Sequence, residues 1–441
     1  MALLPIVVVL LDGLGDRAHA VLGGRTAGEA AATPNLDALV SRGSNGVLCS
    51  LGPGRAPASE LAHWVMLGYL PDEFPGRAVL EAVGRGQAVS ADDVFAYAAL
   101  RPAERRADGH LWLTGRPDPE RDADDARVLV EACARIDVDG FSFRLDEVWR
   151  GEAILRVRGT GTGGAASSTA PAADDRITDT DAFFRDRHPV LRPQACHPAA
   201  APTAAAAEAW TRRTCELLAA HPVNARRRAT GLPELNVITL KWWGRPRPVP
   251  SFAERHGLRG SFGASSAFLR GLAATIGLAA TDLPETGDLA VDLGARVAFI
   301  ELRLAAGDDF VFVHTKAVDE AGHTKEPRRK QQAIEAADAA LGALPVDRVI
   351  VCVTGDHATP ASPEVIHSGD PVPLVVAGPG VRADRVTAFG EIDQAAGILG
   401  HLRGPDLMPV LLNAADRPLF AGSRPTPFRH AQGYPSQLEP L

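Results

Sequence analysis

The chain has 441 residues, of which 46% are hydrophobic and 23% charged, a composition typical of globular proteins that bury a large core. Lysine and arginine total 46 against 54 aspartates and glutamates, and this net charge of −8 argues against nucleic acid as a partner. The five cysteines are scattered and form no C-x-x-C motif. Their pattern excludes a disulfide framework and a zinc ribbon, and it favours a cytoplasmic location.

The first strongly apolar stretch, Ile6 to Leu11, runs directly into Asp12 and is preceded by no basic segment. It is too short to cross a membrane, and no other stretch reaches the roughly 18 apolar residues of a spanning helix. We therefore expect no membrane partner. The β-branched residues of this stretch predict instead a strand that is buried on both faces.

Three further short apolar runs predict strands of the same kind, at residues 310–313, 348–353 and 373–376. Between two of them, the segment from Arg329 to Leu344 places apolar side chains at helical spacing. Alternating strands and helices indicate an α/β fold with a mostly parallel sheet flanked by helices.

Residues 72–247 have a different pattern. Two tracts rich in Ala, Gly, Ser, Thr and Pro, residues 159–173 and 198–209, predict exposed loops. Alternating segments at 141–144 and 153–158 predict strands, and the Arg226-Arg227-Arg228 run predicts a solvated helix face. We expect a core made of residues 1–71 and 248–441, interrupted by a smaller inserted α+β domain of residues 72–247.

Polar side chains gather where the predicted parallel strands end, which is where such sheets bind ligands. They are Asp12, His314, Lys316, Asp319, His323, Asp356, His357 and His367. Each of them alone is more typical of a capping or surface residue, but a mixed set of carboxylates and imidazoles suits two divalent ions that bind a phosphoryl group. The imidazoles favour manganese, zinc or cobalt over magnesium alone.

Ser59 is the candidate nucleophile. It follows Pro57 and precedes Glu60, a pattern that also predicts an ordinary helix N-cap. The two roles are compatible, because backbone N–H groups at the start of a helix stabilise a phosphate dianion. Competing motifs are weak: the chain has neither G-x-x-x-x-G-K nor G-x-S-x-G, and it has no complete dinucleotide loop.

Motifs in order along nearly the whole chain carry a resemblance to a known family. They include Asp12-Gly-Leu-Gly-Asp-Arg17, Ala32-Thr-Pro-Asn-Leu-Asp37, Val313-His-Thr-Lys-Ala-Val-Asp-Glu-Ala-Gly-His323, Thr354-Gly-Asp-His-Ala-Thr-Pro360 and His367-Ser-Gly-Asp370. These segments resemble the archaeal type of 2,3-bisphosphoglycerate-independent (cofactor-independent) phosphoglycerate mutase, which belongs to the alkaline phosphatase superfamily.

The resemblance implies a role for each matching residue. One divalent ion would be held by Asp12, Ser59, Asp356 and His357, and the other by Asp319, His323 and His367. Ser59 would become phosphoserine, while Lys316 and Arg255 would neutralise phosphate charge. The inserted domain would cover a small phosphorylated acid. Manganese is the expected metal, with magnesium, zinc and cobalt as the other options.

The inserted domain departs from the family pattern where substrate contacts are expected. The family's Arg-Gly-Ala-Gly is replaced here by Lys241-Trp242-Trp243-Gly244, its Asp-Pro-His by Asp181-Ala182-Phe183, its Tyr-Arg-His by Trp149-Arg150-Gly151, and its Ala-Gly-Arg by Thr114-Gly115-Arg116. We expect Arg150, Arg116, Lys241 and Asp181 to contact the substrate. We expect the substrate to be either a phosphoglycerate or a related phospho- or phosphonoester that is larger or less anionic.

The same nucleophile and metal ligands are also compatible with other activities. A phospho- or phosphonyl-transferase of specialised metabolism would account for the altered inserted domain, and a phosphatase or phosphodiesterase would result if water reached the phosphoserine. A non-catalytic metal-binding homologue would have no need of both Ser59 and the full ligand set. The sequence predicts no oligomeric state.

Overall fold

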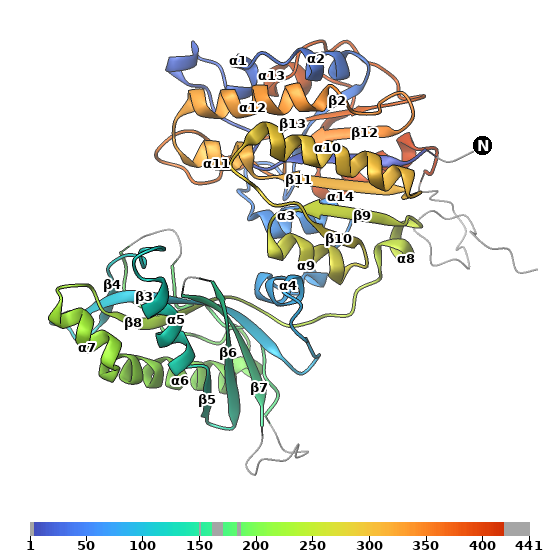
Figure 1. Cartoon of the computed structure of the whole chain (residues 1–441). Coiled ribbons are helices and arrows are strands. Elements are labelled where there is room, and N and C mark those ends of the chain that lie inside the picture. Colours follow the sequence, from blue (N-terminus) through green and yellow to red (C-terminus); the bar gives the residue numbers. More distant parts are fainter. Residues whose placement is uncertain (1–3, 150, 161–170, 183–186, 419–441) are drawn as a thin grey trace, which may run out of the picture. The chain divides into compact units, whose positions relative to one another are not determined.

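The computed structural model describes residues 4–149, 151–160, 171–182 and 187–418 (Figure 1). The described chain divides into two compact units, the first taking in residues up to Phe74 and from Pro248 onward, and the second Pro75–Arg247. The second unit thus starts at Pro75 rather than at residue 72. None of the described helices is both long and apolar enough to cross a membrane.

An eight-stranded sheet organises the first unit, in the order β10-β9-β11-β1-β12-β13-β2-β14. The strands are β1 (Ile6–Leu11), β2 (Ser44–Cys49), β9 (Gly260–Ala264), β10 (Ala279–Asp282), β11 (Phe310–Thr315), β12 (Ile350–Thr354), β13 (Val372–Ala377) and β14 (Gly400–Arg403). All neighbours are parallel except β13, which runs antiparallel to β12 and β2. The predicted α/β fold with a mostly parallel sheet is confirmed.

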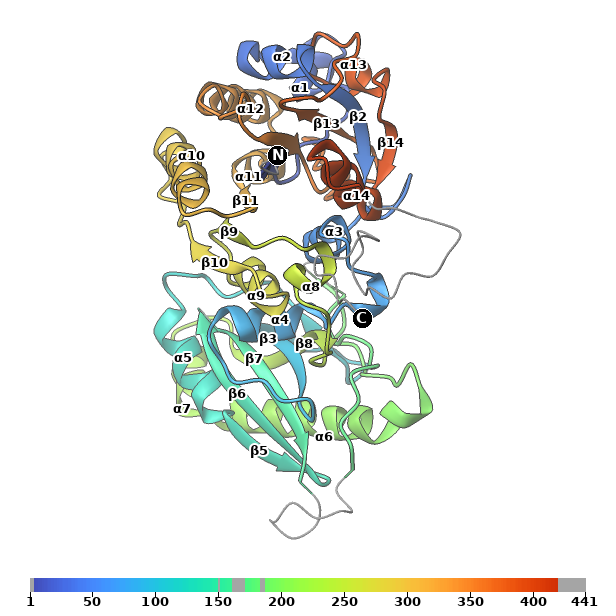
Figure 2. The same ribbon diagram turned by 90° about the vertical axis from the view of Figure 1, so that its right-hand side faces the viewer.

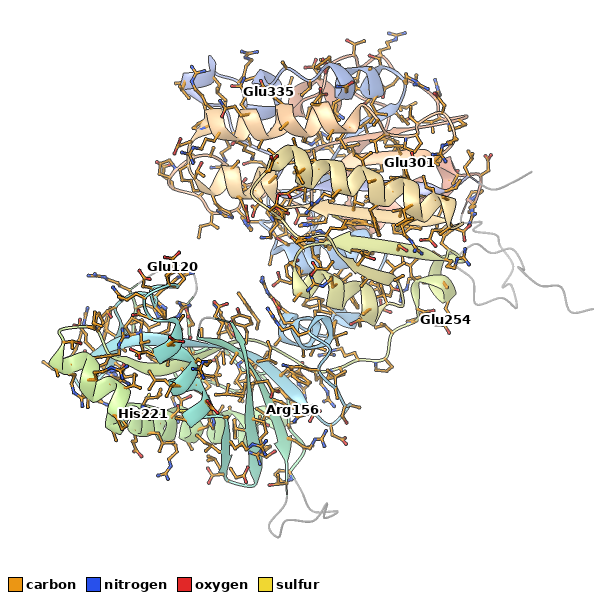
Figure 3. The ribbon with its side chains drawn as sticks, in the orientation of Figure 1. Glu120, Arg156, His221, Glu254, Glu301 and Glu335 are labelled. Atoms are coloured by element: carbon orange, nitrogen blue, oxygen red, sulfur yellow. The ribbon has the colours of Figure 1, made fainter. Side chains whose placement is uncertain are left out.

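Helices cover both faces of this sheet (Figures 1 and 2). One face carries α1 (Ala27–Ala30), α2 (Pro34–Ser41), α10 (Leu289–Ala305), α12 (Pro327–Leu341) and α13 (Glu391–Ala395). The other carries α3 (Ser59–Met66), α8 (Phe252–His256), α9 (Ala267–Thr275) and α14 (Gly404–Ala414), while α11 (Ala317–His323) follows β11. The solvent sides are charged: Glu301 of α10 pairs with Arg348, and Glu335 of α12 accepts a hydrogen bond from the Ala32 amide (Figure 3).

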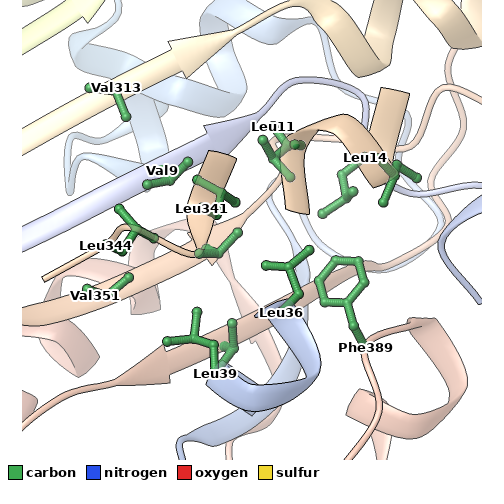
Figure 4. Close-up of a cluster of buried hydrophobic side chains, with 14 of the residues drawn as sticks. Val9, Leu11, Leu14, Leu36, Leu39, Val313, Leu341, Leu344, Val351 and Phe389 are labelled. Carbon is green, nitrogen blue, oxygen red and sulfur yellow. The ribbon is translucent and has the colours of Figure 1, made fainter. Parts of the chain in front are cut away.

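Strand β1 forms the centre of the core because all six of its aliphatic side chains are buried. Alternate residues of a strand face opposite sides, so Val9 and Leu11 point toward the helices on one face of the sheet (Figure 4). There α12 presents Ile334 and Leu341 at helical spacing. Each such side chain contributes roughly 1.5–3 kcal/mol on burial.

The second unit is built on an antiparallel sheet in the order β4-β3-β7-β6-β5, with β8 also paired to β3. Its elements are α4 (Arg77–Gly84), β3 (Val94–Arg105), β4 (Leu111–Leu113), α5 (Ala123–Ala132), β5 (Arg135–Val138), β6 (Phe141–Trp149), β7 (Glu152–Gly159), α6 (Ala201–Ala220), α7 (Pro222–Ala229) and β8 (Leu235–Gly244). Helices α5 and α6 pack on one face and α4 on the other. The two ends of the unit meet, since a Cβ on Gly76 would lie 2.6 Å from the Gly244 Cα.

One expectation for this unit is wrong, and another holds only in part. The tract 198–209 forms a 3₁₀ turn and the start of α6, because alanine is the strongest helix former and the helix buries Trp210 and Leu218. The run Arg226-Arg227-Arg228 lies on α7 with Arg226 and Arg228 exposed as predicted, but Arg227 is 1% exposed and its guanidinium pairs with Asp122 and Asp125. The tract 159–173 lies largely outside the described residues.

Candidate active site

The carboxyl ends of β11, β1 and β12 lie side by side and carry the candidate site. Leu10 of β1 is in register with His314 of β11 on one side and with Thr354 of β12 on the other. Asp12 follows β1 directly, and the polar residues after β11 and β12 therefore reach the same edge of the sheet. Residues 302 positions apart in the chain meet there.

Asp12, Asp356 and His357 form the first of two groups that could hold a metal ion, with ligand atoms within 4.8 Å of one another. The Nε2 atom of His357 lies 3.3 Å from Asp12 Oδ1 and 3.2 Å from Asp356 Oδ2. The Ser59 hydroxyl oxygen lies 2.9 Å from the same nitrogen. The structure thus brings together the four residues expected to share one ion.

Asp319, His323 and His367 form the second group. Asp319 and His323 are four residues apart on α11, and His323 Nε2 lies 3.3 Å from Asp319 Oδ1. His367 reaches the same oxygen from the loop between β12 and β13, at 3.8 Å. Its ring stacks on that of His357 with a 3.9 Å centroid separation, so the two groups are adjacent.

The buried carboxylates of the first group fit a cation. Asp12 Oδ1 and Asp356 Oδ2 are buried and accept no hydrogen bond from the described residues. Burial and the neighbouring charge of Asp12 raise the pKa of Asp356 well above its usual range. A buried, unpaired carboxylate is costly unless a positive charge compensates it, and a divalent ion would supply that charge.

His314 orients Asp12. Its Nε2 lies 3.0 Å from Asp12 Oδ2, and both side chains are fully buried. Burial and the charge of Asp319 oppose ionisation of Asp12, but the hydrogen bond and charge of His314, together with the charge of His357, outweigh them and lower the pKa of this carboxyl group. Such partners of a candidate ligand fix its orientation. Sequence analysis placed His314 at the strand end but assigned it no function.

Ser59 is the first residue of α3, and the N-cap position is taken by Ala58. The N-cap interpretation of Ser59 is therefore wrong, because its side chain is directed to His357 instead of to the backbone of its own helix. The hydroxyl lies at the start of an eight-residue helix, where backbone N–H groups favour an anion.

The two cationic candidates differ in placement. Lys316 Nζ lies 3.8 Å from Asp319 Oδ2, beside the second group. Arg255 instead donates to the Gly68 carbonyl at 2.8 Å, pairs with Glu73 and lies over the Tyr69 ring. None of these partners of Arg255 is a predicted metal ligand.

In the second unit, three of the four predicted substrate residues belong to one charged cluster. Asp181 lies 3.4 Å from Arg101 and 3.2 Å from His188. Burial is the largest cause that lowers the pKa of Lys241 to about 8, and the charge of Arg101 is the next. The charge of Asp181 raises this pKa, and the charge of Arg116 lowers it. Arg150 lies outside the described residues.

Sequence reasoning missed two members of this cluster, Arg101 and His188. A charged residue at the end of the apolar run of β3 was the available signal for Arg101. No local pattern marks His188, because only the fold brings it to Asp181.

Comparisons with known proteins agree with this geometry. A family model described as the metalloenzyme superfamily matches residues 4–414. The 2,3-bisphosphoglycerate-independent phosphoglycerate mutase of Methanoculleus marisnigri is 35% identical over 422 residues, which cover 93% of this chain and 97% of that protein. Its counterpart in Methanopyrus kandleri is 35% identical over 425 residues, covering 93% and 96%.

Solved structures give the same result. The cofactor-independent phosphoglycerate mutase of Thermoplasma acidophilum has a TM-score of 0.63 and 29% identity, covering 93% of this chain and all (100%) of that one. A Pyrococcus horikoshii protein has a TM-score of 0.75 and 28% identity, covering 96% and 100%. The resemblance predicted from the motifs is confirmed, and a metalloenzyme family implies bound divalent metal. The chain belongs to the 2,3-bisphosphoglycerate-independent phosphoglycerate mutases of the metalloenzyme superfamily.

Proposed function

We propose that this chain interconverts 3-phosphoglycerate and 2-phosphoglycerate through a phosphoserine at Ser59, with two divalent ions, foremost Mn²⁺, held by the two groups. One observation carries the proposal: the Ser59 hydroxyl lies 2.9 Å from His357, whose ring stacks on that of His367 from the other group. The names of the relatives supply the substrate, a small phosphorylated acid.

The protein's own residues account for the transfer. Bound ions would supply Lewis-acid stabilisation of the phosphate oxygens and of the Ser59 oxygen. Ser59 Oγ attacks phosphorus in line and the bond to the substrate oxygen breaks; the phosphoryl group passes to serine, and the hydroxyl proton of Ser59 ends on the substrate oxygen, which leaves as a hydroxyl. The N–H groups of α3 and Lys316 balance the charge on the phosphoryl oxygens. The second hydroxyl of the bound acid then attacks the phosphoserine, the Oγ–P bond breaks, and the proton of that hydroxyl returns to the Ser59 oxygen.

A second candidate is the same chemistry on a larger or less anionic phospho- or phosphonoester. Trp242 favours it, because this bulky residue has a φ of 57°, a left-handed conformation, where the family pattern has glycine. Its indole lies 4.2 Å from the Arg77 guanidinium and 4.3 Å from Lys241 Nζ. Such backbone strain costs roughly 1–3 kcal/mol and is typical of functional sites.

Steady-state kinetics with Mn²⁺ test both candidates. We expect purified enzyme to isomerise 3-phosphoglycerate with little release of phosphate, and Ser59→Ala to abolish the isomerisation. A kcat/KM above ~10⁵ M⁻¹s⁻¹ for 3-phosphoglycerate, within the usual enzyme range, contradicts the altered-substrate candidate. Release of inorganic phosphate without isomerisation contradicts the mutase and favours a phosphatase.

A further inference from the structure

Thr359 touches both candidate metal groups. It lies in the loop after β12 and is 0% exposed. Its hydroxyl donates to Asp319 Oδ1 at 2.6 Å, a carboxylate oxygen of the second group. The same hydroxyl lies 3.2 Å from Nδ1 of His357, which belongs to the first group.

Two glycines make room for this threonine. Gly13, which follows Asp12, has a φ of +66°, and a Cβ there would lie 2.5 Å from the Thr359 hydroxyl oxygen. A Cβ on Gly322 of α11 would lie 2.6 Å from the Thr359 carbonyl oxygen. Contacts this short are not tolerated. Only glycine at both positions therefore allows the segment after β1 and helix α11 to lie this close to Thr359.

Lys330 fixes the backbone of Thr359. Its ammonium group is 0% exposed and donates to the Thr359 carbonyl at 2.8 Å, to Gly13 at 2.8 Å and to Gly15 at 2.6 Å. Only four of the 46 basic residues of the chain are lysine. A compact ammonium has three donors for these three carbonyls, whereas the planar guanidinium of arginine does not match them.

The numbers of donors and acceptors determine where the protons of Thr359 and His357 lie. A hydroxyl has one hydrogen to donate, and the ionised Asp319 carboxylate can only accept it. The Thr359 oxygen must then accept the proton of His357 Nδ1, which leaves Nε2 of that ring unprotonated. This nitrogen is the atom that lies among Asp12, Asp356 and Ser59.

We propose that Thr359 is a positioning residue that orients one ligand of each metal group and thereby links the affinities of the two sites. It sets the direction of Asp319 in one group and the tautomer of His357 in the other. The inference rests on the proposed two-metal function, because it concerns the same two groups.

Titration of metal-free protein with Mn²⁺ tests this role of Thr359. The electron paramagnetic resonance signal of free Mn²⁺ measures how much of the metal is bound. We expect Thr359→Val, which keeps the shape and removes the hydroxyl, to weaken both sites by roughly 10–100-fold, the usual effect of losing such a partner. Thr359→Ala, which cannot introduce a clash, should weaken both similarly. Thr359→Ser keeps the hydroxyl and should bind within about threefold of the wild type.

Thr354→Val is the matched control. Thr354 is equally buried at the end of β12, but its hydroxyl donates to the Pro373 carbonyl at 2.9 Å. It should leave both Mn²⁺ affinities within about threefold. The proposal is overturned if Thr354→Val loses as much Mn²⁺ affinity as Thr359→Val. It is also overturned if Thr359→Val and Thr359→Ala both lose affinity at only one of the two sites.

The outcomes also separate this inference from the proposed function. Wild-type protein that binds fewer than two Mn²⁺ ions contradicts the two-metal function itself. Wild-type protein that binds two ions, with Thr359→Val and Thr359→Ala binding them equally well, contradicts only the role of Thr359. Circular dichroism of each metal-free variant checks that the fold is retained before the titration.

Discussion

The carboxyl group of Asp356 is buried in the site, and one of its oxygens accepts no hydrogen bond from the described residues. It is 1% exposed, lies beside Asp12 and accepts one backbone hydrogen bond, from Gly13 at 3.1 Å. A group in this setting depends on a bound cation, so a change that preserves its shape but removes its charge is the most direct test of its role.

Asp356→Asn should lower kcat by several orders of magnitude, because an amide nitrogen cannot replace the carboxylate oxygen as a ligand. The assay is turnover with saturating Mn²⁺, beside circular dichroism to verify folding. Asp370→Asn is the control: it removes a nearby carboxylate that pairs with Arg17 at 2.7 Å, and it should stay within about threefold. If Asp356→Asn keeps more than about a tenth of the wild-type rate, its activation barrier is raised by less than ~1.4 kcal/mol. That increase is too small for the loss of a metal ligand.

Lys241→Met should raise KM for 3-phosphoglycerate by roughly 10–100-fold with a smaller change in kcat. A charge-assisted hydrogen bond contributes roughly 1.5–3 kcal/mol, and each ~1.4 kcal/mol is a factor of ten in binding. Arg247→Met removes an equal charge from the second unit, at a residue that pairs with Asp175 at 3.1 Å. An unchanged KM in Lys241→Met, or the same increase in both variants, removes Lys241 from the substrate contacts.

For single residues, the sequence predicts which side chains lie close together only where their spacing in one helix or strand determines it. Asp319 and His323 share a helix face, so their proximity follows from four residues of separation. The partners of Arg255 could not be predicted, because Glu73 and Tyr69 come to it through tertiary packing. The same holds for His188.

Helices α1 and α13 are joined through a buried carboxyl group. The Thr26 hydroxyl, at the cap of α1, donates to Glu391 Oε2 at 2.6 Å, and the Asp16 amide donates to Oε1 at 3.1 Å. Burial raises the pKa of Glu391 from 4.5 to about 7. This side chain therefore makes the stability of the first unit depend on pH.

The folded protein holds a proton on Glu391 at pH values where the unfolded chain has released it. Its contribution to stability is thus complete below about pH 4.5 and is lost as the pH rises through 7, with an upper size of roughly 3 kcal/mol. Glu391→Gln keeps an oxygen that accepts from the Asp16 amide and gains an NH₂ group that can donate to the Thr26 hydroxyl oxygen, so it preserves both contacts without the charge and should remove this part of the slope. The measurement is the free energy of unfolding in urea at pH 5 and pH 8.

Glu364→Gln supplies the comparison, since Glu364 is exposed and bonded to Ser362 at 3.1 Å. It should retain the wild-type difference between the two pH values. If Glu391→Gln shows the same difference as well, the carboxyl group is ionised in the folded state and the prediction is wrong.

Whole elements were predictable where composition and periodicity agree. The buried strands β1 and β13 follow from short apolar runs rich in β-branched residues, and α12 follows from its apolar face. The start of α6 was missed because an alanine-rich tract has both low complexity and high helix propensity, and burial of Trp210 decides between them.

For the molecule as a whole, divalent metal should be needed for both activity and stability. Three aspartates, Asp12, Asp319 and Asp356, are buried within the two groups. Treatment with EDTA should abolish turnover and lower the melting temperature, and added Mn²⁺ should restore both. An ion present at 100 times its Kd stabilises the folded state by about 2.7 kcal/mol. Undiminished turnover in chelator-treated, metal-free protein contradicts the two-metal function.

At this scale the fold class followed from the alternation of strands and helices, but the direction of β13 did not. A buried apolar run is the same whether its strand is parallel or antiparallel, and only the pairing with β12 and β2 determines it.

The pairing of β1 with β11 also sets an order of events during synthesis. Asp12 and His314 are 302 residues apart, and a ribosome adds roughly 5–20 residues per second, so β1 waits roughly 15–60 s for its partner. The second unit, Pro75–Arg247, is continuous in the chain, and its strands can pair within that interval. Throughout it, Ile6–Leu11 is an unpaired aliphatic strand, the kind of segment on which nascent chains aggregate. We therefore expect the exposed edges of this first strand to stay unpaired until β11 (Phe310–Thr315) has been synthesised.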